Sequence, residues 1–243
     1  MILLLTLLAF IITFLLAFVI VKFVPLKLRW LVSVVLLAVS VFLGFKIYKG
    51  IMEPINFAKE KKLRYAKVIE NLKLIRDAEV KFNEVYGLYT NNKDSLLYFI
   101  ENGELAITET KNIIEKVNKG GGIIVDVSKK VIDTIGHEPV KKYFEDKNYR
   151  DMFKVPGTDV QFELAIGLVE KVQGLNVPVF EAKVSKEPIL KNLPKSLVKQ
   201  ELEAVETDQI KGPFVSVGSL SEVTTGGNWP PYYDKNTSIA KKE

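Results

Sequence analysis

Two uncharged apolar runs at the start of the chain constrain its fold more than any other feature. Residues 1–21 carry no charged side chain, and a second uncharged run covers residues 30–45. A helix of about 20 apolar residues crosses the ~30 Å hydrocarbon core of a bilayer, and a lysine at its end reaches the headgroups. Lys46 therefore allows the second run to extend to Tyr48. The sequence predicts a transmembrane hairpin over residues 1–48, with the lipid bilayer as a partner.

A cleaved signal peptide is the alternative for the first run. Such a peptide has a charged start, a shorter apolar core and a small-residue cleavage site. None of these is clear in residues 1–21, and the chain has no cysteine that a lipid anchor would need. The sequence therefore favours a retained membrane helix.

The basic residues of the chain are unevenly distributed. The protein has 34 Lys and Arg residues, 29 Asp and Glu residues and a net charge of +5. Residues 1–50 contain five of the bases and no acid, which leaves 29 bases against 29 acids in the remainder. A nucleic-acid-binding domain needs a basic excess that neutralises phosphates. The neutral remainder therefore argues against nucleic acid as a partner.

The same bases bear on orientation in the membrane. The connector between the two runs, residues 22–29, contains Lys22, Lys27 and Arg29, which favours a cytoplasmic connector. Lysines from Lys46 to Lys62 favour the opposite orientation, so charge counting leaves both open. The uncharged start eases translocation of the N-terminus, and long domains cross largely regardless of charge. We therefore predict two spans in a bacterial inner membrane, with the soluble domain in the periplasm.

A long helical stem is predicted over residues 49–87. Its apolar positions recur with heptad-like spacing that Glu79 interrupts, and they are Tyr65, Val68, Leu72, Ile75, Phe82 and Tyr86. Gly87 suits the left-handed residue that ends a helix, and Asn91 or Asn92 suits the cap of the next. An isolated helix needs a packed face. We expect Phe82 to pack on the protein's own head, and Tyr65, Val68 and Leu72 to face a partner.

Residues 88–233 are predicted to form a small α+β head. Helices are expected at 93–101, 108–117 and 193–205, and strands at 123–127, 160–166, 177–184 and 214–217. Glycine at 174, between two runs of alternating apolar residues, indicates an antiparallel hairpin. Residues 119–122 are expected to be a flexible break and residues 234–243 a loose polar tail. The predicted fold class is a membrane α-helical hairpin plus an α+β soluble domain, with a long helical stem and a small head of helices and antiparallel sheet.

Residue patterns typical of catalysis are missing from the sequence. The glycines at 120–122 lack the following lysine and hydroxyl that a phosphate-binding loop requires. His137 is the only histidine, and without cysteines a zinc site would have to rely on carboxylates. Ser219 lacks the second glycine of a nucleophile turn. We therefore expect no nucleotide, cofactor or metal and no enzymatic activity, with a carboxylate-dependent hydrolase as an alternative.

Aromatic residues near the C-terminus form a second candidate contact. Trp229, Tyr232 and Tyr233 surround two prolines, and aromatics of this kind anchor protein interfaces. The alternative is that they close over the edge of their own sheet. Both interpretations are open from the sequence.

Three motifs carry a resemblance to a known family. The segments Arg76–Leu96, Phe162–Val184 and Pro213–Trp229 resemble an uncharacterised family of membrane-anchored proteins from Bacteroidota. The resemblance implies a membrane anchor and an extracytoplasmic domain, and it implies no catalytic or binding residues. The stem and the Tyr86–Thr90 turn are also similar to pseudopilins, in shape only, because two spans and no acid before Glu53 depart from the pilin pattern.

These observations lead to one functional expectation and one alternative. We expect a non-enzymatic inner-membrane subunit of a larger envelope assembly, of the kind used in secretion, motility or membrane-protein biogenesis. Its partners would be other envelope membrane proteins, and its periplasmic head would act as a scaffold. The alternative is a membrane-tethered receptor for a ligand or peptide that acts alone.

Overall fold

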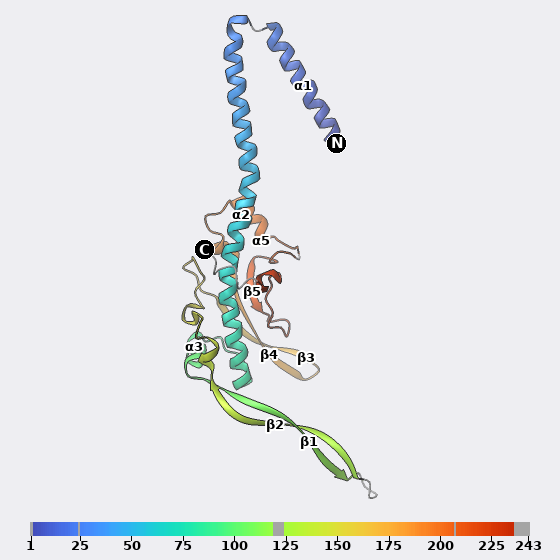
Figure 1. The fold of residues 1–243 in the computed structure, drawn as a ribbon, viewed down its shortest axis with the longest axis vertical. Coiled ribbons are helices and arrows are strands. Elements are labelled where there is room, and N and C mark those ends of the chain that lie inside the picture. Colours follow the sequence, from blue (N-terminus) through green and yellow to red (C-terminus); the bar gives the residue numbers. More distant parts are fainter. Residues whose placement is uncertain (1, 24, 119–123, 207, 236–243) are drawn as a thin grey trace. The chain divides into compact units, whose positions relative to one another are not determined.

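The structure is a computed structural model that describes residues 2–23, 25–118, 124–206 and 208–235 (Figure 1). The chain divides into two compact units, Met1–Asn56 and Phe57–Glu243. The predicted boundaries at residues 48 and 87 therefore differ from this division. Most of the predicted stem, from Phe57 onward, belongs to the second unit together with the head.

The first unit contains helix α1 (Ile2–Phe23), the short 3-10 helix η1 (Leu26–Leu28) and the start of helix α2 (Arg29–Tyr86). The Arg29 guanidinium donates a hydrogen bond to the Val21 carbonyl at 2.8 Å. Within the described residues, α2 is the one helix that is long and apolar enough to cross a membrane, and Phe10–Lys22 is a shorter apolar stretch. The described residues thus include one helix near the N-terminus with the length and composition of a membrane span, and the second predicted span is not shown among them.

The C-terminal part of α2 is the central helix of the second unit. It buries side chains three and four residues apart on one face, among them Tyr65, Val68, Leu72 and Ile75. The helix ends as predicted, because Gly87 has a φ of 72° and its N–H bonds the Asn83 carbonyl at 2.8 Å. This helix end is local chemistry that the sequence predicts correctly.

Helix α3 (Lys93–Asn102) follows after a short loop. The Asn92 side chain accepts hydrogen bonds from the backbone N–H groups of Asp94 and Ser95, which confirms it as the predicted cap. Leu96, Phe99 and Ile100 are buried in the same core as α2. Helix α3 is therefore an integral part of the head.

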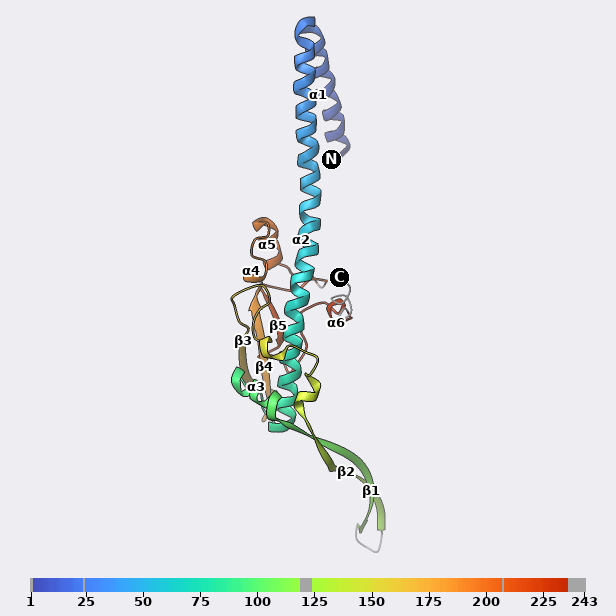
Figure 2. The ribbon, with the colours of Figure 1, turned by 60° about the vertical axis from the view of Figure 1, so that its left-hand side comes forward.

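A three-stranded antiparallel sheet forms the other layer of the head. Its strands are β3 (Glu163–Val172), β4 (Leu175–Ser185) and β5 (Phe214–Gly218), in the order β3-β4-β5. Gly174 turns the predicted β3–β4 hairpin with a φ of 84°. Figure 2 shows the sheet beside the lower part of α2. Side chains from this sheet, such as Phe180 and Val215, share one core with α2 and α3.

Short helices connect and close the sheet. They are η2 (Val140–Tyr143), η3 (Tyr149–Asp151), α4 (Lys186–Ile189), α5 (Lys195–Leu202) and α6 (Tyr232–Lys235). Helix α5 confirms the helix expected after Pro194, although it is shorter than predicted. The head is α+β, as predicted.

The largest error of the sequence prediction concerns residues 108–117. They were expected to be helical, but they lie in strand β1 (Glu104–Asn118), which pairs antiparallel with β2 (Ile124–Pro139). The predicted strand at 123–127 is confirmed from Ile124 onward and is much longer than expected. Half of residues 108–117 are β-branched and fit a strand better than a helix. The predicted break at 119–122 and most of the tail lie outside the described residues.

Candidate functional site

Strands β1 and β2 form a two-stranded ribbon, here called the arm (described for residues 104–118 and 124–139), that extends away from the rest of the head (Figure 1). The ladder runs from the pair Glu104–Pro139 at its base to Asn118–Ile124, with one register shift beside Ile107. No further strand pairs with β1 or β2 among the described residues. Both outer edges of the arm therefore present unpaired backbone donors and acceptors.

The arm exposes apolar side chains on both of its faces. Ile113 is 49% exposed, Ile114 is 68% exposed and Ile132 is 68% exposed. Ile114 and Ile132 lie on one face of the ribbon. Ile132 is directly opposite Thr110, and Thr110 and Ile114 are four residues apart on β1, so their side chains point to the same face. Ile113 points to the other face. Leu105, at the base, is buried in the core of the head. Beyond Leu105, none of the described residues of the arm belongs to the buried core.

The charge of the arm indicates the class of partner. Residues 104–139 contain five lysines and six acidic residues, so the arm has no basic excess. Lys111 lies 3.1 Å from Glu109 and 3.9 Å from Asp133, which balances charge within the ribbon. A phosphate-binding ribbon would need an excess of bases over acids. The arm is therefore suited to a protein partner.

The stability of an isolated ribbon supports the same conclusion. A two-stranded ribbon is only marginally stable in water, and open strand edges readily pair with another chain. Proteins usually shorten or cover such edges. A long, uncovered arm with exposed isoleucines therefore has the features of an element that is completed by binding.

A buried ionic cluster holds the opposite end of the head together. The side chain of Lys186, at the start of α4, is fully buried. Its ammonium donates to the Ile210 carbonyl at 2.6 Å, the Glu201 carbonyl at 2.8 Å and the Glu201 carboxylate at 3.3 Å. These three acceptors satisfy its three donors. Burial lowers the pKa of Lys186, and the neighbouring Glu201 carboxylate partly opposes that effect.

Glu201 on α5 links this lysine to α2. Its carboxylate accepts from the Lys61 ammonium at 2.7 Å and from the Tyr65 hydroxyl at 3.3 Å. Burial, together with the nearby negative charge of Glu201, raises the pKa of Tyr65 above its ordinary value. Because Lys186 is inaccessible and Glu201 is already bound by three partners, this cluster has the geometry of a structural clamp between α2, α4 and α5.

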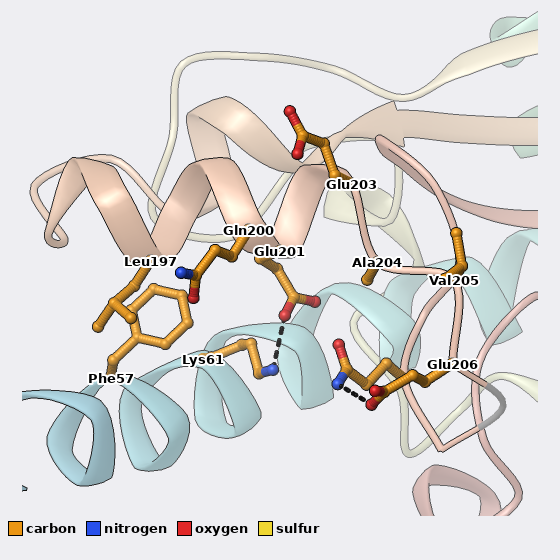
Figure 3. Close-up of a pocket in the computed structure, with 10 residues that line it drawn as sticks. Phe57, Lys61, Leu197, Gln200, Glu201, Glu203, Ala204, Val205 and Glu206 are labelled. Atoms are coloured by element: carbon orange, nitrogen blue, oxygen red, sulfur yellow. Dashed lines mark hydrogen bonds and ion pairs between the residues drawn. The ribbon is translucent and has the colours of Figure 1, made fainter. Parts of the chain in front are cut away.

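A cavity of about 330 Å³ lies beside this cluster (Figure 3). Phe57 and Leu197 form its apolar side, and Lys61 and Glu201 meet in its wall. Glu203 and Glu206 add acidic side chains to the lining. Three glutamates therefore line the cavity. If the protein were a carboxylate-dependent hydrolase, the alternative raised by the sequence, its active site would lie here. Its one lining lysine is already paired with Glu201.

The structure places the predicted stem contacts in the core. Tyr65 is 1% exposed, and Val68 and Leu72 are fully buried within the protein's own head. The expectation that this part of the stem faces a partner is therefore wrong for these side chains. The physical reason is that α4, α5 and the sheet cover the stem from beyond residue 57, so the stripe is filled from within the chain.

The C-terminal aromatics also serve the head itself. Trp229 and Tyr233 are buried in the core cluster, and the Trp229 indole donates to Asp234 at 3.1 Å. The chain pairs Gly227 with Val217 of β5, so this segment closes over the edge of the sheet. Of the three predicted aromatics, Tyr232 alone retains substantial exposure, and Lys62 lies over its ring. The interpretation as an edge cover is the one that the structure favours.

The remaining residues singled out in the sequence do not converge on a site. His137 lies on β2 opposite Ala106, within the arm. Ser219 accepts hydrogen bonds from the backbone N–H groups of Ser221 and Glu222, which makes it a turn cap. No cluster of three potential metal ligands occurs in the described part of the chain. Sequence reasoning missed the arm, whose signal was the β-branched content of β1. It also missed the Lys186–Glu201 clamp, for which no sequence signal exists.

Comparison of the chain with known protein families, with curated proteins and with solved structures finds no match.

Proposed function

We propose that this protein is a non-enzymatic subunit of a larger bacterial envelope assembly, anchored in the inner membrane by two spans. In this proposal the head lies in the periplasm and acts as a scaffold that contacts other envelope proteins. The resemblance to membrane-anchored proteins of Bacteroidota implies the same placement. A membrane-tethered binding protein that acts alone is the alternative.

The arm is the observation that carries the proposal. It is an uncovered two-stranded ribbon with exposed Ile113, Ile114 and Ile132, and it has no basic excess. Strand edges and exposed apolar side chains bind proteins by adding a strand or by packing on a partner. The membrane helix supports the location of the assembly, because α2 is apolar enough to hold the chain in a bilayer.

Co-purification from native membranes tests the proposal. The test compares the full chain with an arm-shortened variant in which an Asn-Gly turn replaces residues 109–133. Thr108 and Thr134 are directly opposite, so a two-residue turn can close the shortened ribbon. The core residue Leu105 stays in place. The head should therefore melt at an unchanged temperature.

We expect the full chain to retain companions in stoichiometric amounts and the arm-shortened variant to lose them. A full chain that purifies alone contradicts membership of an assembly and favours the tethered binding protein. Companions that survive shortening of the arm place the contact elsewhere on the head.

A further inference from the structure

The two edges of the arm differ in how well they resist pairing. The middle of β2 carries Lys129 and Lys130 side by side, and lysines on an edge oppose the approach of another strand. The middle of β1 carries the exposed Ile113 and Ile114. Its lysines, Lys111 and Lys116, are not adjacent to each other, and Lys111 is paired with Glu109 at 3.1 Å. The β1 edge is therefore the one that is more open to a further strand.

The sequence of β1 is complementary to itself in the antiparallel direction. With Ile113 of two copies directly opposite, Lys111 of each copy faces Glu115 of the other. Opposite charges at directly opposed positions stabilise a strand pair, and the two isoleucines form an apolar pair between them. This register therefore joins one apolar contact with two ion pairs.

Neighbouring registers are poorer. A shift of one residue in one direction sets Lys111 against Lys116, and like charges directly opposite destabilise a pair. A shift of one residue in the other direction pairs Glu109 with Lys116 but sets Ile113 against Asn112. A shift of two residues in one direction sets Glu109 against Glu115. The same shift in the other direction sets Ile114 against itself, but it replaces both Lys111–Glu115 ion pairs with Lys111–Val117 and Ile113–Glu115 contacts. The register centred on Ile113 is thus the most favourable near the middle of the strand.

We propose that the arm binds a second copy of this chain, with the two β1 strands paired antiparallel about Ile113 to form a four-stranded sheet in the order β2-β1-β1-β2. This two-fold contact uses the same edge of both copies, as symmetric dimers do. The inference rests on the proposed function, and it identifies the first partner of the arm as the protein itself.

The absence of cysteine from the chain allows a direct test by single-cysteine cross-linking in native membranes. Directly opposed antiparallel residues have Cα atoms about 4.5–5.5 Å apart, which is within the range that a disulfide bridges. An Ile113→Cys variant should therefore form a disulfide-linked dimer on mild oxidation.

Two exposed positions of the arm are matched controls. In the proposed register, the two copies of Thr108 are ten residues apart along the strands, about 33 Å. The two β2 strands are separated by three strand spacings, about 14 Å, so the copies of Ile132 are also out of reach. Thr108→Cys and Ile132→Cys should form little dimer, and all three variants should keep the melting temperature of the head.

Charge reversal tests the register. In the Ile113→Cys background, Lys111→Glu alone or Glu115→Lys alone creates two like-charge pairs and should lower the yield of dimer about three- to tenfold. The double variant exchanges the two charges and should restore the yield. Rescue by the second reversal is specific to a partner that carries the same two residues.

The outcomes separate this inference from the proposed function. Dimer yield at residue 113 that does not exceed the yield at residue 108, or no rescue by the double reversal, overturns the self-pairing. If residue 113 instead cross-links to a different protein, the self-pairing is wrong and the proposed function stands. A specific self-dimer that purifies without other companions supports the self-pairing and contradicts the larger assembly.

Discussion

Glu79 on α2 and Thr90 in the following loop are joined by a partly buried hydrogen bond. The Thr90 backbone N–H donates to the Glu79 carboxylate at 3.1 Å, and the carboxylate is fully buried. Its second oxygen has no partner, nor does the amide nitrogen of Asn83 one turn later. The bond holds the loop after Gly87 against the helix. It explains why an acid interrupts the apolar stripe of the stem.

The burial of Glu79 predicts a pH-dependent stability. Burial raises the pKa of Glu79 from 4.5 to about 7, although the Thr90 N–H opposes the shift. Between pH 4.5 and pH 7, the Glu79 carboxyl therefore holds its proton more tightly in the folded protein than in the unfolded chain. The contribution of Glu79 to stability is therefore present below pH 4.5 and is lost as the pH rises towards 7.

The matched variant for this prediction is Glu79→Gln, which keeps the acceptor for Thr90 and cannot ionise. The free energy of unfolding of the variant, relative to the native protein, should rise by about 3 kcal/mol between pH 4.5 and pH 8. Denaturant unfolding of residues 57–243 at several pH values measures this difference. A difference that does not change with pH would show that Glu79 ionises normally in the fold.

Leu72 should contribute strongly to the free energy of unfolding of the head. It is fully buried on α2 within the core of the head, so Leu72→Ala removes packed methyl groups and leaves a cavity. We expect a loss of about 2–5 kcal/mol in the free energy of unfolding of residues 57–243. Leu63 lies on the exposed side of the same helix, and Leu63→Ala should change stability by less than about 0.5 kcal/mol. Equal effects of the two changes would contradict the burial of the stem.

The clamp predicts that two nearby glutamates, Glu201 and Glu203, contribute very differently to the stability of the head. Glu201→Gln removes the charge that Lys186 and Lys61 both contact, and Lys186 is fully buried. Loss of one partner of a buried ion pair costs about 3 kcal/mol or more. Glu203 is exposed two residues later, and Glu203→Gln should cost less than about 0.5 kcal/mol. Thermal unfolding of the two variants checks this. Similar melting temperatures would mean that the clamp contributes little.

The proposed topology predicts opposite labelling of two positions. Tyr98 is exposed on α3 of the head, and Leu28 is exposed in the connector η1. In cells with a permeabilised outer membrane, Tyr98→Cys should react with a membrane-impermeant thiol reagent. Leu28→Cys should react only after the inner membrane is opened. Neither substitution changes the charges that bear on orientation. Labelling in the reverse pattern would place the head in the cytoplasm.

The sequence by itself determined the features that depend only on residues close together in the chain. The apolar runs predict membrane helices, and α2 is apolar enough to cross a bilayer. Gly87, Asn92 and Gly174 act where predicted, because a left-handed turn or a helix cap needs only its own backbone and the next few residues. The β3–β4 hairpin followed from alternation and a turn in the same way.

Only the tertiary structure decided which surfaces are buried and which are open. The stripe through Tyr65 and Leu72 needed a cover, and the sequence could not show whether this chain or another supplies it. Lys186 and Glu201 meet across 15 residues, and Glu201 meets Lys61 across 140. Such contacts depend on residues far apart in the chain, so their outcome is fixed by packing and not by local pattern.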